Sequence, residues 1–209
     1  MPLWKKFQLN LIAGHNQFTK DALSSASPVK KTTLYAERNE EKRREFVAEI
    51  EQFNPEDLVW LDESGIDEFL QRDYARSPRG KQVISDVCGK KYGRISVIAA
   101  WLSEQKEMIA PYVFNGYTDA KIFNGWLKKC LLPELKTGQV VIMDNAAFHK
   151  SALTKELIES VGCRVLFQPA YSPDLNPIEK QWAVLKRKFR KHKHKFNKFN
   201  DAVDYAFRV

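Results

Sequence analysis

Three acidic residues, Asp62, Asp144 and Glu179, lie at predicted strand ends or near a predicted helix start, where carboxylates are able to bind metal or act in catalysis. Asp62 follows the apolar run Val59–Leu61, and Asp144 follows the β-branched run Val140–Met143. Such runs are typical of buried strands, and sites in α/β sheets form where central strands end. A carboxylate beside a sheet core is unfavourable unless it is paired or binds metal. Each aspartate also fits a simpler role, because Asp commonly starts a turn.

Glu179 stands near the start of a predicted helix and has two interpretations. Asn176, Pro177 and Glu179 match an N-cap, a proline at the first helical position and a capping-box glutamate. Helix geometry also places Glu179 about 100° from Ile178, on the edge of an apolar stripe, where its side chain can reach toward the strand ends. A basic ridge lies within roughly 40° of Glu179, an arrangement suited to holding metal beside a phosphate backbone. The ridge consists of Lys186, Arg190 and Lys193.

The excess positive charge of the chain is concentrated around this ridge. The formal net charge is +8, and residues 180–200 contain nine Lys or Arg and no Asp or Glu. The rest of the chain has 25 basic and 26 acidic residues and is nearly neutral. This distribution indicates a polyanion-binding face, although a solvated basic helix has the same pattern. A second basic segment surrounds a predicted turn and would either contact phosphates or remain solvated. It contains Arg72, Arg76, Arg79 and Lys81.

Length and composition exclude several classes of protein. The 209 residues, 44% of them hydrophobic, suit one well-cored α/β domain with some appendage. No apolar run approaches the roughly 18 residues that cross a bilayer, and we predict no signal peptide. Cys88, Cys130 and Cys163 are scattered without CxxC spacing, so neither a disulfide framework nor a zinc site is predicted. We therefore expect a protein of the reducing cytoplasm.

The predicted elements form a mixed sheet. Three strands followed by strand–helix alternation favour a sheet with both parallel and antiparallel strands and helices on its faces. Strands are predicted at 57–61, 97–101, 108–114, 140–143 and 164–167. Helices are predicted from near Thr33 to Phe53, over 118–135 and 151–161, from Asn176 onward, and over 199–207.

Four sequence blocks carry a family resemblance. They are WLDESG at 60–65, YARSPRGK at 74–81, VVIMDNAAFHKS at 140–151 and QPAYSPDLNPIEKQWAVLK at 168–186. Together they resemble the DDE transposases of the mariner superfamily, particularly its bacterial insertion-sequence branch. The 34 residues between Asp144 and Glu179 match the spacing of that branch. Matched motif to motif, the family's two aspartates and its glutamate are Asp62, Asp144 and Glu179.

The resemblance implies an RNase H-like fold and a transposase activity, which is metal-dependent cleavage at transposon ends followed by strand transfer. It implies two Mg²⁺ or Mn²⁺ ions per site, with Asp62 bridging both while Asp144 and Glu179 each hold one. The implied partner is double-stranded DNA, both transposon end and target, bound by a homodimer or larger assembly at the bacterial nucleoid. The residues expected to contact DNA are Lys186, Arg190, Lys193, Arg76, Arg79 and Lys81.

Two neighbours of these carboxylates have competing interpretations. Glu63 adjoins Asp62, but strand alternation puts the two side chains on opposite faces, and the motif match favours Asp62. His149 follows Asp144 in the same loop, where it would either touch DNA or serve as a capping or packing residue.

The beginning of the chain departs from the family pattern. Such transposases normally begin with helix-turn-helix domains, whereas residues 1–30 show little pattern and read as a segment or linker. We therefore expect residues 31–209 to form a DDE catalytic domain with a basic C-terminal helix. One alternative is a truncated or domesticated derivative that binds DNA without transposing. A nuclease acting on RNA–DNA hybrids would share the carboxylates but not the PAYSPDLNPIE block.

Overall fold

The structure, a computed structural model, describes residues 35–70, 82, 84 and 93–208. The expected N-terminal segment 1–30 lies outside these residues, as do Arg76, Arg79 and Lys81. No helix in the described part of the chain is long and apolar enough to cross a membrane.

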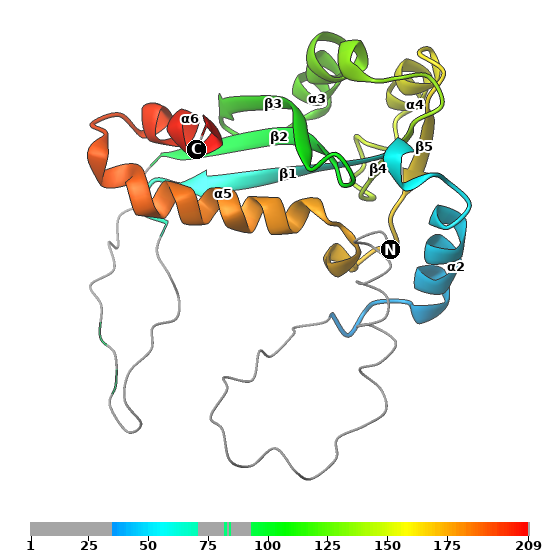
Figure 1. The fold of residues 1–209 in the computed structure, drawn as a ribbon, viewed down its shortest axis with the longest axis horizontal. Coiled ribbons are helices and arrows are strands. Elements are labelled where there is room, and N and C mark those ends of the chain that lie inside the picture. The colour runs from blue at the N-terminus through cyan, green and yellow to red at the C-terminus, as the bar shows by residue number, and fades with distance from the viewer. Residues whose placement is uncertain (1–34, 71–81, 83, 85–92, 209) are drawn as a thin grey trace.

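A five-stranded mixed sheet forms the centre of the fold, in the order β3-β2-β1-β4-β5 (Figure 1). Antiparallel pairing joins β1 to β2 and β2 to β3, while β4 pairs in parallel with both β1 and β5. This confirms the predicted combination of an antiparallel meander with parallel strands. The strands are β1 (Leu58–Asp67), β2 (Arg94–Leu102), β3 (Glu107–Asn115), β4 (Val140–Met143) and β5 (Arg164–Phe167).

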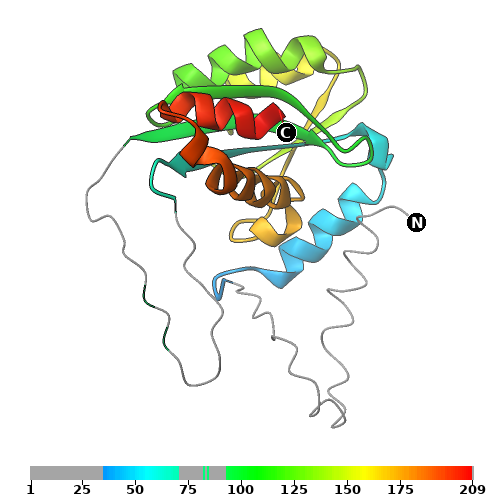
Figure 2. The same ribbon diagram turned by 60° about the vertical axis from the view of Figure 1, so that its left-hand side comes forward.

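Helices cover both faces of the sheet, as predicted (Figures 1 and 2). On one face lie α3 and α4, and on the other lie α2, α5 and α6. The helices are α2 (Glu40–Ile50), α3 (Ala120–Trp126), α4 (Ala152–Glu159), α5 (Ile178–His192) and α6 (Phe199–Arg208). A π-helical turn at Leu127–Leu131 and 3₁₀ turns at Pro55–Asp57, Leu132–Glu134, Pro173–Leu175 and Lys193–Lys195 complete the elements.

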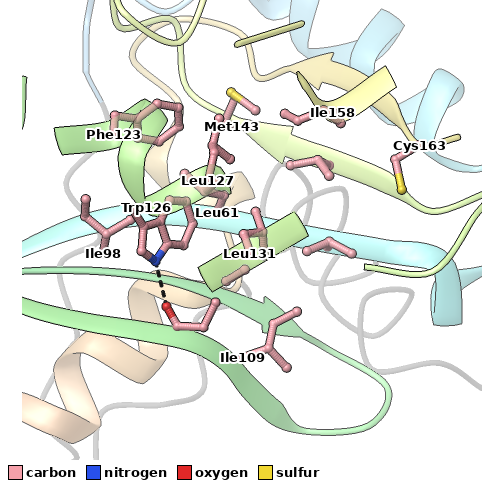
Figure 3. Packing of buried hydrophobic residues seen from close by; sticks show 14 residues of the cluster. Leu61, Ile98, Ile109, Phe123, Trp126, Leu127, Leu131, Met143, Ile158 and Cys163 are labelled. Atoms are coloured by element: carbon pink, nitrogen blue, oxygen red, sulfur yellow. Dashed lines mark hydrogen bonds between the residues drawn. The ribbon is translucent and has the colours of Figure 1, made fainter. Parts of the chain in front are cut away.

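Strand alternation divides the apolar core between the two faces. Leu61 of β1 and Met143 of β4 point toward α3, where they pack with Phe123 and Trp126 (Figure 3). The buried Trp126 indole N–H donates to the Ala110 carbonyl at 2.8 Å. Ala110 has a φ of 50°, close to a register shift between β2 and β3, so the indole satisfies a carbonyl beside the irregular ladder.

β1 is longer than predicted, which changes the place of Asp62. The strand extends from Leu58 to Asp67, so Asp62 lies within it rather than after it. Pairing with β2 accounts for the extension, because Asp62 lies opposite Ala99 and Asp67 opposite Arg94. A polar and glycine-containing stretch is thus held in the sheet by an antiparallel neighbour.

Two helices begin later than predicted because different side chains cap them. Asn39 caps α2, accepting from the backbone N–H groups of Glu41 and Lys42 at 3.0 Å each, so α2 begins at Glu40 rather than near Thr33. Asp119, not Thr118, caps α3. The helix predicted to reach residue 135 ends at Trp126 and continues as the π-helical and 3₁₀ turns.

Candidate active site

The sheet register places Asp62 and Asp144 at the same level on neighbouring strands. The parallel pairing of β1 and β4 ends at Trp60 opposite Ile142, and each aspartate follows two residues later. Since neighbouring strands lie about 4.8 Å apart, the two backbones emerge side by side. β4 ends there, so Asp144 is exposed, whereas β1 continues and keeps Asp62 partly buried.

The helix α5, which extends alongside β1 in Figure 1, positions the Asp62 carboxylate. The Trp182 indole N–H donates to Asp62 Oδ2 at 3.0 Å. Trp182 belongs to the predicted apolar stripe, whose other members are also buried. The stripe is formed by Ile178, Trp182, Leu185 and Phe189.

Glu179 lies one helical turn before Trp182 and acts electrostatically on Asp62. Burial, followed by the negative charges of Glu179 and Glu63, raises the pKa of Asp62 to about 8. Partial burial also raises the pKa of Glu179, while the charge of Lys186 lowers it. Asp62 and Glu179 are therefore close enough for their negative charges to repel each other when both are ionised.

The capping-box interpretation of Glu179 does not match the local hydrogen bonds. Asn176 Oδ1 accepts from the Ile178 N–H at 3.3 Å, so the predicted cap residue does serve the start of α5. A capping-box glutamate would accept from the Asn176 N–H. That N–H instead donates to the Pro173 carbonyl at 3.0 Å. The Glu179 carboxylate is thus not needed to cap the helix.

Asp144 is held by its own loop. His149 Nδ1 lies 2.6 Å from Asp144 Oδ1, and the Ala146 N–H donates to the same oxygen at 2.9 Å. The hydrogen bond from His149 lowers the pKa of Asp144, outweighing the opposite effect of the partial loss of hydration. The charges that raise the pKa of Asp62 are those of Glu179 and Glu63.

His149 lies between two carboxylates in the interior. Its Nε2 is 3.1 Å from Glu63 Oε1, its side chain is fully buried, and its ring lies 4.4 Å from that of Phe123 between centroids. Burial lowers its pKa, but the hydrogen bonds to Asp144 and Glu63 raise it to about 9 overall. The Glu63 side chain contacts His149 and the Asp62 side chain contacts Trp182, so the two acids point to opposite faces of β1, as expected. The buried position of His149 favours the packing interpretation over a DNA contact.

Sequence reasoning missed the ion pair that fixes the loop before α5. The Arg43 guanidinium of α2 donates to both carboxylate oxygens of Asp174, at 2.9 and 2.7 Å. Arg43 is buried, although it lies in a helix of mixed charge. The only sequence signal was its spacing, since Arg43, Phe46 and Ile50 recur at i, i+3 and i+7 on the buried face. A hydrogen bond also holds this loop, because the side-chain amide of Asn145 donates to the Gln168 carbonyl.

The carboxylates of Asp62, Asp144 and Glu179 are ligands that suit a divalent cation, although their oxygens do not converge on one point in this structure. Within the described residues, no group of three or more His, Cys, Asp or Glu side chains lies closely enough to hold a metal ion. Carboxylate oxygens are nevertheless the ligands that Mg²⁺ and Mn²⁺ prefer. Burial and the charges of Glu179 and Glu63 raise the pKa of Asp62, and a bound cation would oppose them by stabilising the ionised carboxylate.

The basic ridge lies along α5 and the turn that follows it. Lys186, Arg190 and Lys193 are each partly buried. Lys193 Nζ donates to the Glu68 carbonyl at 3.5 Å and lies 5.6 Å from the Phe69 ring centroid. Lys193 thus contacts the segment that follows β1, and the role of the ridge in binding DNA stays a prediction.

Comparison with known proteins connects this geometry to a family. Residues 57–201 match the family model described as DDE superfamily endonuclease. No curated protein matches the sequence. The chain is similar to the solved Mos1 strand transfer complex, with a TM-score of 0.63 at 17% identity over 98% of this chain and 68% of that one. It is also similar to the mariner Mos1 paired end complex with Mg, with a TM-score of 0.63 at 16% identity over 89% of this chain and 59% of that one.

A third solved structure, the pre-cleavage Mos1 transpososome, gives a TM-score of 0.58 at 18% identity over 79% of this chain. The chain spans 54% of that protein's length, and similarly 56% of the Mos1 paired-end complex with left transposon end. At these identities the likeness shows the fold, which is the predicted RNase H-like one. Nothing in these matches separates the bacterial branch from the rest of the superfamily, so that branch stays a prediction.

Proposed function

The chain belongs to the DDE superfamily endonucleases, and from this premise we propose that it cleaves DNA at transposon ends and joins the cut ends to target DNA. Asp62, Asp144 and Glu179 are the proposed catalytic carboxylates. The observation that carries the proposal is the juxtaposition of Asp62 and Glu179 across β1 and α5, with no cationic side chain hydrogen-bonded to Asp62 among the described residues. The register that places Asp144 level with Asp62 supports the third member.

We propose that these carboxylates hold two Mg²⁺ or Mn²⁺ ions. Solved Mos1 paired end complexes are named as containing Mn and Mg, which supports the choice of metal. Such ions supply Lewis acidity that activates water, then the 3′-hydroxyl of the cut end, and stabilises the leaving oxygen. In this chain, Trp182 orients Asp62 through its indole N–H. Asp62, with a pKa of about 8, must lose its proton before both carboxylate oxygens can act as anionic donors.

Double-stranded DNA is the proposed partner, bound as transposon end and target by a homodimer or larger assembly. The names of the Mos1 structures include a paired-end complex with the left transposon end, which supports a DNA partner. The α5 helix carries Glu179 in its first turn and Lys186 and Arg190 further along, with Lys193 directly after it. This arrangement would place phosphates beside the carboxylates.

A nicking and joining assay tests the proposal. The protein is incubated with Mg²⁺, a duplex with a pre-cut transposon-like end and a supercoiled target plasmid. Wild-type protein should nick and join, and Asp62→Ala, Asp144→Ala or Glu179→Ala should each abolish both while leaving DNA affinity within about twofold, because metal and phosphate use different residues. The exposed Glu56→Ala serves as the matched acidic control. DNA binding without nicking by the wild type in either Mg²⁺ or Mn²⁺ would instead support a non-transposing derivative.

The salt dependence of DNA binding tests the basic ridge. Replacing Lys186, Arg190 and Lys193 together with alanine should flatten the slope of log K against log salt by about 2–3 units, roughly 0.9 per lost phosphate contact. The matched control removes three lysines from the opposite face of the sheet and should leave the slope unchanged. These control residues are Lys121, Lys128 and Lys129. An unchanged slope in the ridge variant, or a hundredfold preference for one sequence, would contradict the proposed mainly electrostatic binding.

A further inference from the structure

We propose that His149, itself held by Glu63, is a positioning residue that fixes one oxygen of Asp144 and leaves the other for a divalent cation. This inference rests on the proposed function of Asp144 and deepens it. It assigns roles to two residues that the transposase chemistry itself does not use.

The bonds around Asp144 converge on a single oxygen. His149 Nδ1 and the Ala146 N–H both bond Asp144 Oδ1, at 2.6 and 2.9 Å. Within the described residues, no hydrogen bond engages Oδ2. Two donors on one oxygen fix the rotation of the carboxylate about its Cβ–Cγ bond, so Oδ2 has a defined direction.

The imidazole is fixed on its other edge as well. Its Nε2 bonds Glu63 Oε1 at 3.1 Å, and Glu63 directly follows Asp62 in β1. The His149 ring packs against Phe123 and Phe148, with centroid distances of 4.4 and 4.5 Å. The bridge Glu63–His149–Asp144 therefore ties the loop after β4 to the strand that carries Asp62, and sets the relative position of the two aspartates.

A role in direct substrate contact does not fit His149. Its side chain is fully buried and both ring nitrogens are engaged. Residues that orient a carboxylate or imidazole ligand from behind typically change metal affinity 10–100-fold when replaced. The expected effect of removing His149 is therefore weaker cation binding, rather than weaker DNA binding.

The test is Mn²⁺ affinity without DNA, measured by the electron paramagnetic resonance signal of free Mn²⁺, together with the Mg²⁺ concentration for half-maximal nicking. His149→Ala should weaken both by tenfold or more. His149→Asn should recover part of the loss, because its amide nitrogen can replace Nδ1 toward Asp144. Glu63→Gln, which retains the side-chain shape, should give a smaller loss of about two- to fivefold, because Glu63 supports the ligand only through His149.

Phe148→Leu is the matched control, because it loosens the same packing and leaves the hydrogen bonds in place. It should lower the melting temperature without changing Mn²⁺ affinity. If His149→Ala and His149→Asn melt earlier but bind Mn²⁺ like the wild type, while Asp144→Ala does not, the positioning role is wrong and the proposed function survives. If the wild type binds Mn²⁺ but never nicks DNA, the proposed function fails, and the Mn²⁺ affinities of the variants still decide the positioning role. A wild type that binds no Mn²⁺ would overturn the inference.

Discussion

Asp62 and Asp144 lie at the same level of neighbouring strands, but their carboxylates have opposite electrostatic surroundings. Asp62 is partly buried among Glu63, Glu179 and a neutral indole, and its pKa is raised to about 8. Asp144 is exposed and bonded to His149, which lowers its pKa. One side of the site thus has a built-in cationic partner, whereas on the other side burial and two neighbouring carboxylates oppose the ionisation of Asp62, which a bound metal ion would favour.

The two sides also differ in how the chain assembles them. His149 follows Asp144 by five residues, so one loop supplies both the aspartate and the histidine that bonds it. Trp182 follows Asp62 by 120 residues, and the ion pair that fixes the loop before α5 joins residues 131 apart. The Asp62 side therefore depends on the docking of α5, and perturbations of that docking should affect it alone.

The largest expected effect comes from breaking the Arg43–Asp174 ion pair. Arg43→Met removes a bidentate partner and leaves Asp174 partly buried, which should destabilise the protein by about 3 kcal/mol and lower its melting temperature by roughly 6–12 °C. Arg38→Met, which breaks the more exposed pair with Glu40, should cost less than about 1 kcal/mol. Calorimetry measures both, and NMR titration should find the pKa of His149 unchanged in Arg43→Met. A shifted His149 pKa would show that the two sides are not independent.

Effects of opposite sign on the two sides are expected from neutralising each aspartate. The folded protein holds the Asp62 proton up to about pH 8, whereas the unfolded chain releases it near pH 4, so ionisation of the unfolded chain progressively reduces the stability of the fold between these values. Asp62→Asn should therefore stabilise the metal-free protein at pH 8.5 and have very little effect at pH 4. Asp144→Asn should destabilise it slightly at both pH 7 and pH 8.5, because the lowered pKa of Asp144 marks a favourable ionised form. Denaturant titration at the stated pH values would contradict this account if both changes had the same sign at pH 8.5.

The smallest effect concerns the pH dependence contributed by His149. Its folded pKa of about 9 exceeds its unfolded value, so its favourable contribution is fully present below about pH 6.5 and is lost as the pH rises through 9. The charges that face it are Glu63 and Asp144, and Lys150 lies close to Asp144. In an Asp62→Asn background, which removes the other titration, His149→Asn should flatten the remaining decline in stability between pH 6.5 and 9. A decline of unchanged size would mean that His149 does not carry it.

The elements with strong local signals were predicted well from the sequence. The β-branched run of β4 and the strand β5 have the predicted boundaries, and the stripe of α5 is buried as its spacing indicated. The second half of β1 was missed, because its polar residues and Gly65 carry no strand pattern of their own and are held by pairing with β2. The end of α3 was missed for a similar reason, since the following turns pack through Leu127 and Leu131 without an α-helical ladder.

The same distinction applies to the candidate site. Helix periodicity predicted the buried stripe of α5 beside Glu179, and strand alternation separated Asp62 from Glu63. The bond from Trp182 could not be predicted, because an apolar stripe explains a buried tryptophan without saying where its N–H points. The enclosure of His149 by Glu63 likewise depends on the contact between β1 and the loop after β4, which only the folded chain brings together.

Proton release on metal binding tests the central claim, which is that Asp62 is protonated at neutral pH in the metal-free protein and loses this proton when it binds a metal ion. Calorimetric titration with Mn²⁺ in buffers of different ionisation enthalpy measures the protons released per site. Because the pKa of Asp62 is about 8, binding at pH 7 should release about one proton, and this release should disappear above pH 9 and in Asp62→Asn. Absence of proton release at pH 7, together with equal Mn²⁺ affinity in Asp62→Asn and the wild type, would contradict the account.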